Sequence, residues 1–112
     1  MAGKFEVSKN ASGAFHFSLK AGNGEKILSS ETYESKAGVQ NGIESIRKNA
    51  ADDSRYARKN SANGEWYFNL LSTNGETVGT SETYASMAAL EKGVESVKTN
   101  APGAEIVDAT NS

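Results

Sequence analysis

Short segments in the first third of the chain alternate between apolar and polar residues. Over residues 5–7 and 15–19 every second side chain is apolar, which is the pattern of a strand with one buried face. A third short strand is expected around residues 27–28. The Asn23-Gly24 pair before it favours a type I′ hairpin turn, because such a turn needs positive φ angles. The pattern therefore predicts three successive strands.

After residue 35 the apolar spacing changes to that of a helix. Val39, Ile43 and Ile46 follow one another at intervals of four and three, so they would form one stripe on a helix. Ser35 is a suitable N-cap, since its hydroxyl can accept a hydrogen bond from an amide of the first turn. Gly42 lies beside the stripe, where glycine costs about 0.5–1 kcal/mol relative to alanine. We interpret Gly42 as a residue that lets the helix and sheet backbones approach closely.

The same pattern occurs twice, with a period of 51 residues. Residues 10–50 align without a gap on residues 61–101, and 18 of these 41 positions are identical. A fixed period usually marks one supersecondary unit that packs against its copy to bury its apolar face. A last strand is expected over residues 104–108. In the second copy Trp66, Phe68 and Leu70 are the inward strand residues, and Ser86 is the N-cap. The helix stripe consists of Leu90, Val94 and Val97, with Gly93 beside it.

The expected fold class is α+β, built from two tandem β-β-β-α(-β) repeats. About six or seven strands would form one antiparallel sheet, with both helices packed on one face and the other face open to water. Residues 1–112 are expected to form a single domain of two pseudo-symmetric repeats, at approximately residues 3–53 and 54–110.

The junction between the repeats is the ambiguous segment. Residues 53–60 align backward with residues 2–9 and forward with residues 104–111. We therefore expect this segment to end one unit and to begin the next. The register of its strand stays open, because Val7 aligns with Arg58.

Composition narrows the classes of function. Twelve basic and 14 acidic residues give a formal net charge of −2, so no global basic field attracts nucleic acid or anionic lipid. The chain has no cysteine and one histidine, which excludes disulfides, thiolate chemistry and a His/Cys zinc site. No apolar run approaches the roughly 18 residues needed to span a bilayer, and the first residues lack the apolar run of a signal peptide. A cytoplasmic location is therefore expected, without membrane association.

Several of these motifs carry a resemblance to a known family. They are the alternation at 15–19, the turn at 23–25, residues 30–35 and 41–50, their partners in the second repeat, and the closing residues 100–108. Over nearly its whole length the chain resembles the YegP-like family of small, mainly bacterial proteins of unknown function. The resemblance implies β-β-β-α-β units that pair into one sheet and exchange their final strands. This chain would be a tandem member, or pseudo-dimer, that carries its own partner. The resemblance implies no established activity, cofactor or catalytic residue.

The Ser-Glu-Thr-Tyr segment at residues 30–33 and 81–84, called the cassette below, is a candidate binding motif because it repeats without change. In a functional interpretation, Glu31 and Glu82 accept hydrogen bonds in a pair of related pockets, and Tyr33 and Tyr84 form the walls. A structural interpretation is favoured. A carboxylate near a helix N-terminus interacts with the helix dipole, and a tyrosine ahead of the N-cap can pack on the first turn.

Two further groups of residues suggest surfaces and not catalysis. His16 and its counterpart Tyr67 are expected on the open sheet face, and the sequence suggests no nucleophile or orienting carboxylate near them. Arg55, Arg58 and Lys59 form a basic group at the junction, which makes a weak single-stranded nucleic-acid binder the alternative function. We predict no catalytic, cofactor-binding or metal-binding residues, and no cofactor.

The favoured function is a non-catalytic binding or protein-interaction module. A protein partner would dock on the uncovered sheet face or at a sheet edge, where an extended segment can add as a further strand. Nucleic acid is the less favoured partner. Because each repeat would cover the apolar surface of the other, we expect a monomer with internal pseudo-twofold symmetry.

Overall fold

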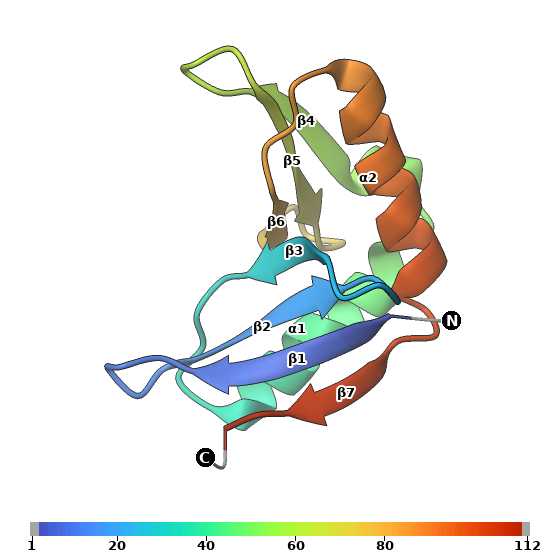
Figure 1. Ribbon diagram of the computed structural model, residues 1–112. Coiled ribbons are helices and arrows are strands. Elements are labelled where there is room, and N and C mark those ends of the chain that lie inside the picture. The colour runs from blue at the N-terminus through green and yellow to red at the C-terminus, as the bar shows by residue number, and fades with distance from the viewer. Residues whose placement is uncertain (1–2, 111–112) are drawn as a thin grey trace.

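The computed structural model describes residues 3–110. This part of the chain forms seven strands, two α-helices and one short 3-10 helix (Figure 1). Two β-β-β-α units follow each other, which confirms the expected α+β fold. In chain order the elements are β1 (Lys4–Lys9), β2 (Phe15–Lys20), β3 (Lys26–Ser30), α1 (Lys36–Asn49), η1 (Asp53–Arg55), β4 (Tyr56–Asn60), β5 (Trp66–Leu71), β6 (Thr77–Ser81), α2 (Met87–Asn100) and β7 (Glu105–Asp108).

The strands form one sheet in the order β4-β5-β6-β3-β2-β1-β7. The two repeats meet at its centre, where β3 and β6 pair in antiparallel fashion. The expectation of a wholly antiparallel sheet is wrong at one place, because β7 pairs in parallel with β1. The reason is visible in Figure 1: α2 returns the chain to the end of the sheet at which β1 starts, so β7 runs in the same direction. The last strand of the second repeat is thus placed on the first repeat.

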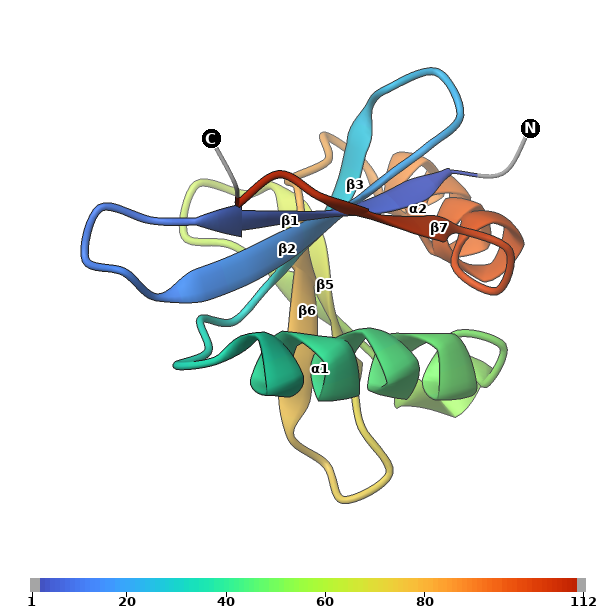
Figure 2. The same ribbon diagram turned by 90° about the horizontal axis from the view of Figure 1, so that it is seen from below.

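Both helices pack on the same face of the sheet, as expected. Phe5, Leu19 and Leu28 lie opposite one another on this face of β1, β2 and β3. They belong to one buried cluster that also contains the apolar stripes of both helices. The sheet is strongly twisted, and β1 and β2 cross β5 and β6 steeply when the molecule is seen from below (Figure 2). Other members of the cluster are Phe17, Ile43, Ile46, Phe68, Leu70, Leu90, Val94 and Val97.

The helices begin where the sequence predicts. The hydroxyl of Ser35 accepts a hydrogen bond from the Gly38 amide at 3.1 Å, and the hydroxyl of Ser86 accepts one from the Ala89 amide at the same distance. Each bond satisfies one of the amides that the first turn of a helix leaves without an intrahelical partner. Both predicted N-caps are confirmed.

The hairpin turns differ from the expected type. Gly24 has a φ of 88°, whereas Asn23 has no positive φ, which a type I′ turn would require. The Gly24 amide donates to the Ala21 carbonyl at 2.9 Å, and the Ala21 amide donates to the Glu25 carbonyl at 2.8 Å. The loop is therefore a type I turn closed by a left-handed glycine, so that glycine alone takes the positive φ. Gly13, Gly64 and Gly75 have the same left-handed φ in the other hairpins.

The outer face of the sheet carries a row of small polar residues. Ser18, Ser29, Thr80 and Asn69 lie side by side across β2, β3, β6 and β5. Ser18 and Asn69 are only 9% and 7% exposed, and Asn69 Nδ2 donates to Thr80 Oγ1 at 2.8 Å. The face expected to be open to water is thus partly closed to it at its centre, at Ser18 and Asn69.

The junction explains the asymmetry of the sheet. β4 pairs with β5 as β1 pairs with β2, so β4 has in the second repeat the place that β1 has in the first. Within residues 3–110 the first repeat has no separate closing strand, because the segment that would supply it is already part of η1 and β4. Only one final strand is therefore exchanged between the repeats, and β4 ends the sheet on its side.

Candidate functional site

The cassette leads from the third strand of each repeat toward its helix. Ser30 Oγ accepts a hydrogen bond from the Phe17 amide at 2.8 Å and donates one to the Glu31 carbonyl at 2.7 Å. Ser81 forms the same two bonds, with the Phe68 amide at 2.9 Å and the Glu82 carbonyl at 2.7 Å. The serine hydroxyl takes the place of a backbone partner where the third strand leaves the sheet. The first cassette residue thus has a structural role.

The cassette tyrosine packs into space left by the helix glycine. Tyr33 exchanges two backbone hydrogen bonds with Phe15, at 2.7 and 2.8 Å, which hold it beside β2. Its ring stacks on Phe17 with the ring centroids 6.3 Å apart. A Cβ atom added to Gly42 would lie 2.9 Å from the Tyr33 Cζ atom. The expected role of Gly42 is therefore corrected: its missing side chain makes room for a tyrosine ring and not for the sheet backbone.

The second repeat preserves this unit. Tyr84 exchanges backbone hydrogen bonds with Trp66 at 2.7 and 2.8 Å, and its ring stacks on Phe68 with centroids 6.5 Å apart. A Cβ atom added to Gly93 would lie 2.7 Å from the Tyr84 Cζ atom. In the sequence the tyrosine and the glycine belong to separate motifs. Their joint repetition was the signal that they touch.

Each cassette also lines a groove between its own helix and a hairpin of the other repeat. In the larger groove, of about 730 Å³, Glu31 and Tyr33 face residues of the β5–β6 hairpin. In the smaller groove, of about 390 Å³, Glu82 and Tyr84 face residues of the β2–β3 hairpin, including Glu25. The cassette residues are thus brought together in two related grooves. Binding of a ligand there stays a prediction.

The tyrosine hydroxyls in these grooves are neutral at physiological pH. Burial raises the pKa of Tyr33 above its ordinary value of 10.0, and the charge of Glu31 adds to the effect. Burial likewise raises the pKa of Tyr84, and the negative charges of Glu82 and Glu25 raise it further. Both phenols can therefore donate a hydrogen bond to an acceptor that enters the groove.

Removing these hydroxyls is expected to leave the fold intact. Tyr33→Phe and Tyr84→Phe should each change the free energy of unfolding by less than about 0.5 kcal/mol, because neither hydroxyl has a hydrogen-bond partner among residues 3–110. Tyr56→Phe is the matched control. The Tyr56 hydroxyl donates to the Ala50 carbonyl at 2.6 Å in a buried setting, and leaving that carbonyl unpaired should cost about 1–3 kcal/mol. Urea unfolding measures the free energy of unfolding of all three variants. A large decrease for Tyr33→Phe would show that the Tyr33 hydroxyl does stabilise the fold.

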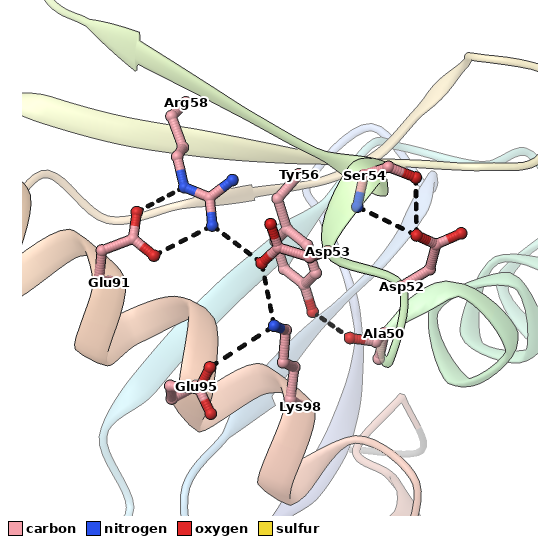
Figure 3. A network of polar contacts seen from close by, with 9 residues as sticks. All are labelled: Ala50, Asp52, Asp53, Ser54, Tyr56, Arg58, Glu91, Glu95 and Lys98. Carbon is pink, nitrogen blue, oxygen red and sulfur yellow. Dashed lines mark hydrogen bonds and ion pairs between the residues drawn. The ribbon is translucent and has the colours of Figure 1, made fainter.

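The junction residues form a network of ion pairs with α2 (Figure 3). Arg58 binds Glu91 through Nε at 2.5 Å and through Nη2 at 3.0 Å. The same Nη2 also contacts Asp53 at 3.1 Å, and Lys98 contacts Asp53 at 3.0 Å. The hydrogen bond from Lys98, followed by that from Arg58, lowers the pKa of Asp53 below its ordinary value of 3.8. The network fixes β4 against the helix of its own repeat.

The stability contributed by Asp53 should depend on pH. Since its pKa is lower in the folded state than in the unfolded chain, its charge stabilises the fold above about pH 4 and ceases to do so as the pH falls through the lowered value. Asp53→Asn should therefore unfold more easily than the parent protein at pH 7, and the difference should shrink toward pH 2. Glu34→Gln, at an exposed carboxylate without an ion pair among the described residues, is the control. A difference between Asp53→Asn and parent that does not change with pH would contradict this role.

This pairing weakens the nucleic-acid alternative without testing it. Arg58 is held by two carboxylates, and Arg55 lies 3.5 Å from Asp52. Lys59 is the member of the predicted basic group that has no ion pair within residues 3–110. His16 and Tyr67 lie on the outer sheet face in different halves, opposite Ser8 and Lys59. The structure therefore does not join these residues into one site with the cassettes.

The difference between the two ends of the sheet was not predicted from the sequence. β1 is covered by β7, whereas its counterpart β4 has no strand on its outer side among the described residues. The double alignment of residues 53–60 was the available signal, because one segment cannot form both a closing strand and an opening strand.

Residues 3–110 contain neither a helix that could span a membrane nor a cluster of metal-binding side chains. Neither helix is long and apolar enough to cross a bilayer. No three histidine, cysteine, aspartate or glutamate side chains gather there in a way that would hold a metal ion.

Comparisons with known proteins agree with the repeat architecture. A family model described as a domain of unknown function, DUF1508, matches residues 10–56 and again residues 61–108. A UPF0339 protein from the ptx operon 5′ region of Stutzerimonas stutzeri is 50% identical over 111 residues, 99% of this chain and 100% of its own length. The UPF0339 protein YegP of Escherichia coli O157:H7 is 46% identical over 98% of this chain and all of its own.

Two solution NMR structures have the same fold. That of yegP from E. coli, a protein of unknown function, has a TM-score of 0.95 at 46% identity and covers 100% of this chain and 97% of that one. That of a UPF0339 protein from Shewanella oneidensis has a TM-score of 0.92 at 45% identity, and it covers 98% of this chain and 93% of that one. None of these relatives indicates a catalytic family. The resemblance seen in the sequence is confirmed: the chain belongs to the YegP-like UPF0339 proteins and contains two copies of the DUF1508 domain.

Proposed function

We propose that the protein is a non-catalytic protein-interaction module that accepts an extended segment of a partner protein at the outer edge of β4. The observation that carries this proposal is the difference between two equivalent strands. β1 has β7 paired along its outer edge, and β4 has the same place in the other repeat with its outer edge unpaired within residues 3–110. The β1–β7 pair supports the proposal, because it is an example within the molecule of a strand added at the equivalent edge.

The backbone of β4 has the groups that strand addition needs. On β1, the Val7 carbonyl accepts a hydrogen bond from the Ala109 amide at 2.8 Å. Backbone groups of alternate residues point to the same side of a strand, and the residue equivalent to Val7 is Arg58. On the other side of β4, the Phe68 amide of β5 points to the Ser81 hydroxyl and away from Arg58. The amide and carbonyl of Arg58 therefore point to the free edge, where an extended segment can pair with them.

The edge has features that oppose pairing with another copy of itself. β4 is short, five residues, and carries Arg58 and Lys59. Two β4 strands placed edge to edge would bring like charges together, and charged residues on short edge strands are a common protection against self-association. We therefore expect a monomer in dilute solution. Sedimentation should give one species of 11.8 kDa, and a stable dimer would contradict this.

The alternative of a nucleic-acid binder and the expected cytoplasmic location stay predictions. A phosphate-driven complex would weaken steeply with salt, whereas backbone pairing along β4 would respond less. A shift assay with mixed single-stranded oligonucleotides at low salt tests the alternative directly, because electrostatic binding is strongest there.

The proposal is tested by site-specific photo-crosslinking. A photoreactive residue replaces Lys59 on the free edge, or Ser8 at the equivalent place on β1 as the control, and the proteins are exposed to a lysate. Crosslinks to defined proteins are expected from position 59 and not from position 8. Arg58→Pro removes an amide that faces the edge and should abolish them, whereas Arg58→Ala keeps the amide and should retain them. Crosslinks that are equal at both positions, or absent at both, would overturn the proposal.

A further inference from the structure

We infer that the segment accepted by β4 is acidic, runs parallel to β4, and has apolar residues between its acidic ends. This inference rests on the proposed function and adds the chemistry of the partner. Its basis is the register of β7 on β1, transferred by the 51-residue repeat to β4.

The transfer fixes the direction and the neighbours of the added segment. On β1, Glu105 lies opposite Lys4 and Ile106 opposite Phe5, and Asp108 lies opposite Val7. A shift of 51 residues changes these three neighbours to Arg55, Tyr56 and Arg58. A segment like β7 would thus meet a cation at each end and an aromatic residue between them.

The charges along β4 favour acidic residues at the ends of such a segment. From Arg55 to Asn60 the chain carries three cations and no carboxylate. Arg58 is engaged by Glu91 at 2.5 Å and by Asp53 at 3.1 Å, but Arg55 is held only at 3.5 Å, both by Asp52 and by the Thr73 carbonyl. Lys59 is exposed and has no ion pair within residues 3–110. Arg55 and Lys59 are therefore the cations that remain for a partner.

The counterpart edge shows that this chemistry is already used once in the molecule. β7 has the sequence Glu-Ile-Val-Asp, and Asp108 contacts Lys36 of α1 at 2.9 Å. Arg47 of α1 donates from Nη2 to the Ala104 carbonyl at 2.6 Å, just before β7. An acidic strand is thus held on its helix side by two cations of the first repeat. In the second repeat the residue equivalent to Lys36 is the exposed Met87 of α2, so Arg55 and Lys59 become more important for an acidic segment beside β4.

The experiment uses the full chain and a synthetic peptide with the sequence of residues 103–110 as the probe. Backbone NMR spectra recorded during titration should shift at residues 55–60 and leave β1 unchanged. A control peptide with lysine in place of its glutamate and aspartate should bind at least several-fold more weakly. A peptide with glutamate in place of the residue equivalent to Ala109, which would lie opposite Lys59, should bind about two- to five-fold more tightly, as expected for one exposed ion pair.

Matched protein variants test the role of the edge cations. Arg55→Glu should weaken binding of the acidic peptide, whereas Lys48→Glu, the same change of charge on α1, should have a much smaller effect. Binding independent of peptide charge, shifts confined to β1, or no saturation at millimolar peptide would overturn the inference. Oligomers of the protein alone that Arg58→Pro abolishes would also overturn it, because a second copy would then be the occupant. Crosslinks at position 59 without peptide binding would overturn only this inference. The absence of both crosslinks and peptide binding would overturn the proposed function as well.

Discussion

Gly79→Leu is expected to destabilise the protein by about 3 kcal/mol, at the upper end of typical overpacking effects. Leu28 and Gly79 are equivalent residues of the two repeats, and they meet where β3 and β6 pair at the centre of the sheet. A Cβ atom on Gly79 would lie 2.7 Å from Leu28 Cδ2 and 2.8 Å from Leu28 Cγ. Space at the pseudo-twofold axis therefore holds one leucine side chain and not two.

Exchanging the two residues is the control for this explanation. Leu28→Gly alone should cost several kcal/mol, since it empties a site where the side chain is 1% exposed. In the double variant Leu28→Gly with Gly79→Leu, the loss in free energy of unfolding should be about 2 kcal/mol smaller than the sum of the losses in the two single variants. Such a coupling is typical of residues in contact. Denaturant unfolding of the four proteins gives this value. Simple additivity would show that the two positions do not share one space.

The amount of the fold that the sequence predicts can be judged from particular residues. The alternation at residues 15–19, the stripe of Val39, Ile43 and Ile46, and the caps Ser35 and Ser86 lead directly to strands and helices, because each signal depends on local geometry. Duplication then predicts that the helices share one side of a common sheet. These features need no knowledge of how distant segments meet.

The remaining features depend on long-range geometry that a local pattern does not contain. The parallel pairing of β7 with β1 follows from the path of the chain after α2. The role of Gly42 follows from the position of Tyr33, nine residues earlier, in three dimensions. Of the candidate binding residues, the cassettes do come together in grooves, but the basic junction is tied to α2 by Asp53 and Glu91. The free edge of β4 becomes visible only when the strand order is known.

The pairing of tyrosine and glycine also gives the second large prediction. Gly42→Val and Gly93→Val should each lower the free energy of unfolding by about 1–3 kcal/mol, because the added side chain would collide with the ring of Tyr33 or Tyr84. The effect should be larger at Gly93, where an added Cβ would lie 2.7 Å from Tyr84 Cζ, compared with 2.9 Å for Gly42 and Tyr33. Ala88→Val, at an exposed position of α2, is the control for helix propensity and should cost less than about 1 kcal/mol.

Shortening the tyrosine should relieve the collision. In a Tyr84→Leu background the further change Gly93→Val should cost at least about 1 kcal/mol less than in the parent, as expected for directly contacting residues. Thermal and denaturant unfolding of the single and double variants measure the difference. An equal cost in both backgrounds would mean that valine disturbs the helix itself, and the cassette tyrosine would then have no part in keeping position 93 a glycine.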